Sequence, residues 1–462
     1  MLAVGGSIGT GLFVALGESL SAAGPGGTMV AYLAIGVMIY FVMMGLGEMG
    51  AYMPISGSFE TYGEKFIDPA FGFAMGWNYW YYWAITIATE LVAASMVVKF
   101  WLPEADTLVL NTLFMILLVA LNLLSVKAYG ESEYWFAGIK VITIIVFLIV
   151  GTLMITGIMG GKAAGMEYWF AGEAPFVGGA HSAFGVFVIA GFSFMGVELV
   201  GIAAGESENP AHGIPKAARS VFWRNLLFYL GSIFVVGCLI PYNEPNLLRT
   251  GIENISVSPF TLIFERAGLA IAASFMNAVI LTSVLTVGNS GVYAASRMLF
   301  SLAEGGKAPA VFAKLNKRGV PVPAIIATMA AACVCYLTSP NGDGTVFVWL
   351  VNACTMAGFI AWFGIALSHY RFRKAIIAQG RIQELKFKSK LYPFGPIFAM
   401  ITMPQTIIGQ GPSMLTGGHM NWFVAISYLS IPLFVILYFG YKVVYKTKIV
   451  KAEEADLNKT SI

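Results

Sequence analysis

Near its start the chain reads Gly5-Gly6-Ser7-Ile8-Gly9-Thr10-Gly11-Leu12-Phe13, inside a long apolar stretch. Four glycines in seven positions do not favour a continuous helix, because each costs about 1 kcal/mol relative to alanine in a helix interior. An interrupted membrane-spanning segment exposes backbone N–H and C=O groups, which lipid tolerates only where they line a cavity or meet a ligand. The stretch therefore predicts a broken transmembrane helix with a binding site at the break.

The composition of the whole chain predicts a membrane protein. Of its 462 residues, 58% are hydrophobic and only 11% are charged, with a mean hydropathy of +0.77, whereas soluble domains carry about 25% charged residues. We expect an all-α polytopic protein without a cleavable signal peptide, and a short polar tail upstream of Met1. The four cysteines all lie in apolar stretches, so no disulfide framework is expected.

Apolar stretches of about 20 residues, the length that crosses a bilayer, recur along the chain. Twelve spans are expected, near residues 3–22, 28–50, 72–98, 107–126, 134–158, 182–204, 222–241, 268–297, 323–339, 346–369, 391–411 and 422–444. An even number of spans places both termini on the same side of the membrane.

The distribution of Lys and Arg predicts which side is cytoplasmic, because cytoplasmic loops carry an excess of both. With cytoplasmic termini, only Lys99, Lys162, Arg249 and Arg266 of the 27 lie outside, and Lys140 lies within a span. All the others fall in cytoplasmic loops or in the tail. This asymmetry predicts cytoplasmic termini and explains the basic loops without any nucleic-acid partner.

A second interruption lies in the sixth expected span, which reads Ala190-Gly191-Phe192-Ser193-Phe194-Met195-Gly196-Val197-Glu198. It follows the first interruption by five spans. Because five is an odd number, a second repeat of five spans crosses the membrane in the opposite direction to the first. Interruptions at matching positions of two inverted halves point to a transporter site, whereas close helix packing at the glycines is the alternative. Phe192 and Phe194, within the break, are candidates to close over a substrate.

Three ionisable side chains stand out inside expected spans, because such a group at mid-bilayer costs several kcal/mol and is a functional candidate. They are Glu90 in the third span, Lys140 in the fifth and Glu198 beside the second break. Each is a candidate carrier of a transported proton, and a structural ion pair is the alternative. Asn352 in the tenth span is a candidate for lining a substrate path.

Enzymatic and metal-binding functions find no support in the sequence. The four histidines form no metal-ligand cluster, and there is no catalytic triad or nucleophile elbow. The glycines at residues 5–11 follow no strand, so they fail the context test for a nucleotide-binding loop.

Several motifs together resemble one family. They are the stretch at residues 5–13, Ser56-Gly57-Ser58-Phe59, Gly76-Trp77-Asn78-Tyr79-Trp80 and Gly196-Val197-Glu198-Leu199-Val200-Gly201-Ile202-Ala203-Ala204-Gly205-Glu206. The chain is similar over essentially its whole length to the amino acid transporter family of the amino acid–polyamine–organocation superfamily. Residues 255–262 and 359–373 look most like lysine-specific bacterial members of that family.

The resemblance implies a five-plus-five inverted repeat with broken helices 1 and 6 and two extra helices. The parts would be a first repeat at 1–158, a second at 181–370, the extra helices at 391–445 and a cytoplasmic tail at 446–462. The implied activity is proton-coupled import of an amino acid by alternating access in a bacterial inner membrane, without a cofactor. L-lysine is the expected substrate. The alternatives are arginine or an aromatic amino acid, or a membrane sensor that binds an amino acid, with a regulatory membrane partner.

The resemblance also implies roles for residues. Amides at the first break would hold the α-carboxylate, carbonyls of both breaks would take the α-ammonium, Phe192 would be the gate, and Lys140 would replace a sodium ion. A lysine side chain needs a buried partner, because an unpaired ammonium costs several kcal/mol; Glu90 is the expected partner and Glu198 the rival. The expected substrate-binding residues are Ser7, Ile8, Gly9, Thr10, Gly11, Glu90, Phe192, Ser193, Met195, Glu198 and Asn352, with Lys140 and Glu198 for proton coupling.

Overall fold

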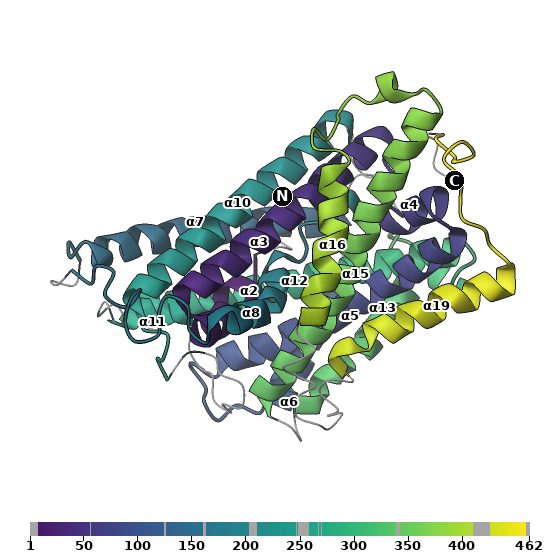
Figure 1. The fold of residues 1–462 in the computed structure, drawn as a ribbon. Helices are drawn as coiled ribbons and strands as arrows, with labels where there is room; N and C mark the ends of the chain where they lie inside the picture. The colour runs from purple at the N-terminus through teal and green to yellow at the C-terminus, as the bar shows by residue number, and fades with distance from the viewer. Residues whose placement is uncertain are drawn as a thin grey trace, which may run out of the picture.

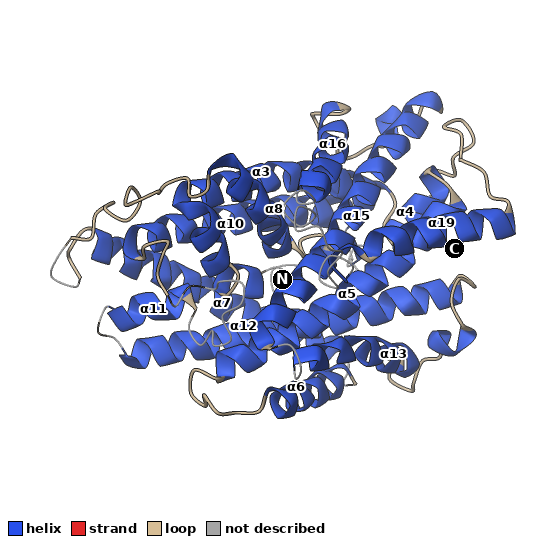
Figure 2. Ribbon diagram, turned by 60° about the horizontal axis from the view of Figure 1, so that its bottom comes forward, coloured by secondary structure: helices blue, strands red, loops and turns tan. Residues whose placement is uncertain are grey.

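The architecture is known from a computed structural model, which describes residues 8–55, 57–123, 126–159, 163–202, 210–245, 247, 258–266, 268, 270–338, 342–409 and 426–458. Within these ranges every regular element is a helix and none is a strand (Figure 1, Figure 2). The all-helical fold that the composition predicts is therefore confirmed for the described chain.

Seven helical segments of the described chain are long and apolar enough to cross a membrane. They are α3 (Leu16–Tyr52), α5 (Pro69–Val98), α7 (Val126–Ile155), α8 (Gly179–Phe194) together with α9 (Leu199–Ile202), α10 (Pro210–Leu239), α12 (Ala270–Glu304) and α15 (Asp343–Ala378). Shorter apolar helices are α6 (Thr107–Asn122), α13 (Val322–Ala332) continued by η3 (Cys333–Leu337), and α19 (Ser430–Tyr445). Helix α16 (Phe394–Gly409) has 16 residues. The chain is thus a polytopic membrane protein.

The first two expected spans are joined in the structure. The short helix α2 (Thr10–Phe13) and the beginning of α3 occupy the first, and the remainder of α3 occupies the second. The two parts of α3 meet at Gly24, whose φ of 71° is one that glycine adopts readily. The carbonyl of Pro175 accepts hydrogen bonds from the amides of Gly26 and Gly27 at 2.9 and 3.1 Å, so the bend leaves these amides satisfied.

Four short helices of the described chain lie outside the expected spans. They are α4 (Phe59–Phe66), α11 (Pro259–Arg266), η2 (Ala310–Ala313) and η4 (Ile382–Glu384). Each is far shorter than the bilayer thickness requires, so a search for spans does not detect it.

Two groups of helices meet around α2. One group has α5 packed against α12 and α15, the other has α3 packed against α8 and α10, and α2 contacts α8, α12 and α3 (Figure 1). The apolar part of α5 is 89% buried and that of α7 is 28% buried. The helix that carries Glu90 is therefore central, and α7 lies at the periphery.

Asp68 anchors the start of α5. As N-cap it accepts a hydrogen bond from the Ala70 amide at 2.9 Å, another from Thr447 Oγ1 at 2.6 Å, and it pairs with Lys442. Burial alone would raise the pKa of Asp68, but the hydrogen bonds from Lys442, Thr447 and Ala70 outweigh burial and hold the pKa below its usual range. These bonds tie the central helix to the C-terminal part of the chain.

Candidate functional site

The first expected span is not one continuous helix in its described part, and Gly5 to Ser7 of the glycine-rich stretch lie outside the described residues. Gly9 is extended, with φ −160° and ψ −134°, and no side chain caps α2, which ends at Phe13 before α3 begins at Leu16. The amides of Leu12 and Phe13 donate to the Gly9 carbonyl at 3.2 and 3.1 Å. The break therefore leaves a single isolated turn of helix, buried in the centre of the protein.

The sixth expected span is broken as well. Helix α8 ends at Phe194, and a short irregular segment leads to α9 at Leu199. Gly196 lies in this segment with φ 85°, a conformation that strains other residues. The glycines in this stretch thus predicted the interruption correctly.

The two breaks touch each other. A Cβ atom added at Gly11 would lie 2.4 Å from the Cα of Ser193, so only glycine fits at this contact. Ser193 is itself fixed, because its hydroxyl bonds the Tyr32 hydroxyl at 2.7 Å and its carbonyl accepts a hydrogen bond from Tyr229. The two interrupted regions therefore lie against each other at one place in the described structure.

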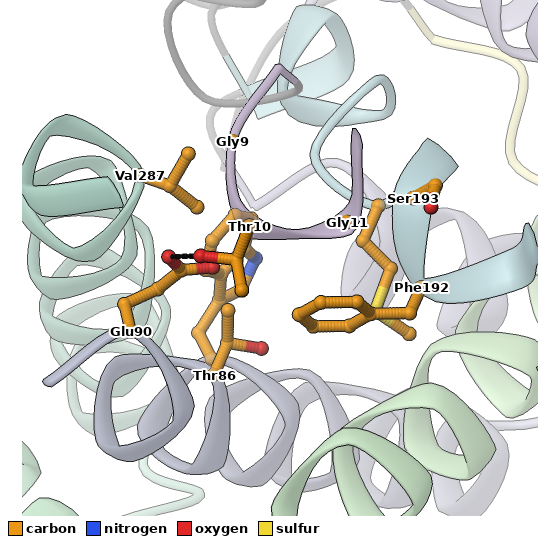
Figure 3. Close-up of a pocket in the computed structure, with 10 residues that line it drawn as sticks. Gly9, Thr10, Gly11, Thr86, Glu90, Phe192, Ser193 and Val287 are labelled. Carbon is orange, nitrogen blue, oxygen red and sulfur yellow. Dashed lines mark hydrogen bonds between the residues drawn. The ribbon is translucent and has the colours of Figure 1, made fainter. Parts of the chain in front are cut away.

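A small cavity lies where the breaks face α5 (Figure 3). Its volume is only about 10 Å³, room for about one water molecule. Across it the Phe192 ring lies opposite Thr10 and Glu90 (Figure 3). The lining consists of Gly9, Thr10, Gly11, Trp83, Thr86, Glu90, Phe192, Ser193, Met195 and Val287.

Glu90 joins the first break to α5. Its side chain is 2% exposed and accepts a hydrogen bond from the Thr10 hydroxyl (Figure 3). Lys140 on α7 is 1% exposed and interacts electrostatically with this carboxylate. Glu90 therefore faces the cavity with a neutral hydroxyl as its hydrogen-bond donor.

Glu198 has a different environment. It is fully buried and accepts hydrogen bonds from the hydroxyls of Tyr79 and Tyr82, both at 3.3 Å, and from Trp362 Nε1 at 3.1 Å. These donors belong to α5 and α15, and Glu198 is absent from the cavity lining. The structure thus separates the two carboxylates, with Glu90 at the cavity and Glu198 in a polar cluster formed with Tyr79 and Tyr82, earlier along α5, and with Trp362.

Most of the expected substrate-binding residues come together at the cavity. Gly9, Thr10, Gly11, Glu90, Phe192, Ser193 and Met195 all line it. Ile8 is buried and Asn352 donates to the Val348 carbonyl at 2.8 Å; neither of them, nor Lys140, lines the cavity. Ser7 lies outside the described residues.

Three lining residues escaped the sequence analysis: Trp83, Thr86 and Val287. Trp83 is fully buried, and its indole N–H has no hydrogen-bond partner in the described part of the chain. Trp83 and Thr86 precede Glu90 by seven and four positions, a spacing that places all three on one face of a helix. Extending the face of Glu90 backwards along the span would have identified both.

No group of His, Cys, Asp or Glu suited to a metal ion occurs in the ranges that the structure describes. The cavity instead offers an aromatic ring, backbone groups at two breaks and one carboxylate. Such a set can hold a small zwitterion with an extra cationic group through hydrogen bonds and charge.

The comparisons with known proteins agree on one family. The family model described as "Amino acid permease" matches residues 1–454. The chain is 54% identical to the "Lysine-specific permease LysP" of Escherichia coli, over 98% of this chain and 94% of that protein. It is 49% identical to the LysP of Lactococcus lactis, over 99% and 91%, and 46% identical to the "Histidine permease HisP" of the same organism, over 99% and 96%.

Proposed function

Because the chain belongs to the amino acid permease family, we propose that it imports L-lysine together with protons by alternating access. The observation that carries this proposal is the buried carboxylate of Glu90 at the cavity between two helix breaks. The names of two relatives, at 54% and 49% identity, support lysine as the substrate. No cofactor is needed, since protons would supply the coupling.

In this proposal the substrate is recognised in two parts. Backbone groups of Ser7 to Gly11 and of Phe192 to Met195 bind the α-carboxylate and α-ammonium, whatever the side chain is. Glu90 pairs with the ε-ammonium, because a lysine side chain buried without a partner would cost several kcal/mol. Glu198 is the rival partner; its three hydrogen-bond donors favour a structural role.

The small volume of the cavity is consistent with an occluded state, between the outward-open and inward-open states of a transporter. With room for about one water, it must enlarge before an amino acid enters. Phe192 lies across the cavity from Glu90 (Figure 3), so a swing of this ring would open or close the site. We propose Phe192 as the gate, with Ile8 and Asn352 behind the lining.

For topology we propose twelve spans with a five-plus-five inverted repeat at residues 1–158 and 181–370, and two extra helices at 391–445. The excess of Lys and Arg places both termini in the cytoplasm of a bacterial inner membrane. A negative interior would then favour lysine entry by about 2.3 kcal/mol per charge per 100 mV.

Uptake of labelled lysine into proteoliposomes tests the substrate and the coupling. An imposed inward proton gradient should drive lysine above equilibrium, and collapsing the gradient should release it. Counterflow of a neutral amino acid without counterflow of lysine would overturn the substrate assignment. Transport of another amino acid is the second candidate function, supported by the histidine permease at 46% identity.

Lys140 is the proposed coupling residue, because it is buried on α7 and interacts with Glu90. Substitution Lys140→Ala should abolish gradient-driven accumulation while lysine counterflow, which needs no gradient, continues. Lys140→Arg, which keeps the charge, is the matched control and should retain part of the accumulation. Equal loss of accumulation and counterflow in Lys140→Ala would assign the residue a structural role.

A further inference from the structure

Two adjoining cavities lie at one end of the helix bundle and share no lining residue with the candidate site. The larger has a volume of about 620 Å³ and lies between α3, α10 and the segment before α16. The smaller, of about 410 Å³, shares Arg219 and Phe387 with it. Helix α3 packs against both α10 and α16 (Figure 1), so the three elements form one continuous wall.

These cavities are strongly cationic. Lys216 and Arg219 on α10 and Lys386, Lys388 and Lys390 before α16 line them, and no acidic residue does. All five side chains are exposed. None pairs with a carboxylate in the part of the chain that the structure describes. The wall therefore carries five positive charges without a counter-charge of its own.

The segment that carries Lys386, Lys388 and Lys390 is held in place by a buried residue between the lysines. Lys386, Lys388 and Lys390 are exposed, whereas Ser389 between two of them is buried. The Ser389 amide donates to Glu48 at 2.6 Å, and Arg373 Nε donates to the same carboxylate at 2.5 Å. Glu48 is thus already paired, and it orders the segment without neutralising its lysines.

The cations continue into apolar surface along the same helix faces. On α10, Lys216 and Arg219 are followed at helical spacing by Trp223 and Leu227, which are 50% and 62% exposed. At the start of α16 the exposed side chains include Phe394 (59%) and, about two turns on, Ile401 (54%). On such a surface, the headgroup of a bilayer lipid would meet the cations and its acyl chains would meet the exposed apolar faces.

We propose that these cavities bind the headgroup of an anionic phospholipid, with its phosphodiester on the cations and its acyl chains along α10 and α16. Basic pockets between transmembrane helices on the cytoplasmic side suit such headgroups. Lys and Arg are the side chains that pair with phosphate oxygens. Aromatic residues such as Tyr40, Phe41 and Trp223, which surround the cavities, suit the level of the headgroups.

The test uses the full chain in detergent, titrated with dioctanoyl phosphatidylglycerol and followed by native mass spectrometry. Dioctanoyl phosphatidylcholine has the same chains without net charge, and glycerol 3-phosphate is a soluble anion. The site variant is Lys386→Gln/Lys388→Gln/Lys390→Gln. The control, Lys314→Gln/Lys317→Gln/Arg318→Gln, removes the same charge from exposed residues of another loop. Unchanged lysine binding shows that each variant is folded.

We expect phosphatidylglycerol to bind wild type in preference to phosphatidylcholine, and the site variant to bind it at least about tenfold more weakly, since each cation beside the anionic headgroup strengthens binding. The control variant should bind as wild type. Equal weakening in both variants would reduce the effect to overall charge and overturn the proposal. Binding of glycerol 3-phosphate as tight as that of the lipid would overturn it in favour of a soluble anion. Arg219→Gln, which lies in both cavities, gives a smaller loss and tests the site if the triple variant does not fold.

Discussion

The two broken helices each have a buried carboxylate beside them, but the carboxylates are bonded in different ways. At the first break, Glu90 faces the cavity and accepts a hydrogen bond from the Thr10 hydroxyl. At the second, Glu198 accepts hydrogen bonds from three neutral donors and lies outside the cavity lining. The two acids, each buried beside a helix break, therefore differ in their hydrogen-bond partners and in their access to the cavity.

The difference follows from the number of donors that each carboxylate already has. A carboxylate accepts about four hydrogen bonds, so Glu198 has little capacity left for a ligand. Glu90 keeps most of its acceptor capacity on the cavity side. We therefore expect changes at Glu90 to alter substrate selection and changes at Glu198 to alter stability.

Substitution Glu90→Gln gives the largest expected effect. It should weaken lysine binding at least about 100-fold, because removing one partner of a buried charge pair costs about 2 to 5 kcal/mol. Affinity for L-norleucine, which has the same length without the charge, should change much less. Isothermal titration of both ligands measures the ratio. An unchanged lysine affinity would remove Glu90 as the side-chain partner.

Substitution Gly11→Ala tests the contact that brings the two breaks together. Its new Cβ would lie 2.4 Å from the backbone of Ser193, so we expect a loss of about 2 to 3 kcal/mol in stability and loss of lysine binding. Gly9→Ala is the matched control. Its Cβ would meet only the end of the Val287 side chain, at 2.5 Å.

Stability of both glycine variants is measured as the midpoint of thermal unfolding in detergent. Val287→Ala should restore Gly9→Ala and leave Gly11→Ala impaired, because the second clash involves backbone. The structure indicates that the two breaks constrain each other through the contact of Gly11 with Ser193. Rescue of both variants by Val287→Ala would contradict this.

The sequence predicted the broken helices well and the environments of the carboxylates poorly. Glycine clusters act locally, so the extended Gly9 at the start of α2 and the interruption at Gly196 are visible in the residues themselves. The donors to Glu198 come from residues 116, 119 and 164 positions away in the chain. No local pattern encodes such a distance, so the sequence gives Glu90 as the expected partner and Glu198 as the rival without predicting the donors around Glu198.

Packing also explains the other differences. The joining of two expected spans into α3 depends on the Pro175 carbonyl, which caps amides at the bend from a distant loop. The short helices α4 and α11 have eight residues each, too few for a span pattern. Trp83 and Thr86 were detectable from their spacing to Glu90, whereas Val287 was not, because it reaches the cavity from α12.

Substitution Glu198→Gln should cost about 2 kcal/mol of stability, because an amide nitrogen would face donors that now find a carboxylate oxygen. Affinities for lysine and norleucine should fall by the same factor, if at all. Trp362→Phe removes a single donor and should cost less. Thermal unfolding measures the stability of each variant, and titration measures its affinity for both ligands. A selective loss of lysine affinity in Glu198→Gln would give this acid the role assigned to Glu90.

The smallest expected effect concerns Asp68, an acid outside the site that anchors α5. Its hydrogen bonds to Lys442, Thr447 and Ala70 outweigh burial and lower its pKa in the folded state. Its stabilising contribution is therefore present above the unfolded value of about 3.9 and is lost as the pH falls through the lower folded value. Asp68→Asn should lower stability by about 1 kcal/mol at pH 7.

Unfolding midpoints of wild type and Asp68→Asn, compared from pH 7 down to pH 3, check the sign. The gap between the two proteins should stay constant to about pH 4 and narrow below it. Lysine affinity at pH 7 should be the same in both, because Asp68 is remote from the cavity lining. A fall in affinity would mean that the anchoring of α5 by Asp68 also positions Glu90. The binding site and the supporting structure would then be coupled along this helix, whereas the contrast between Glu90 and Glu198 treats them as separate.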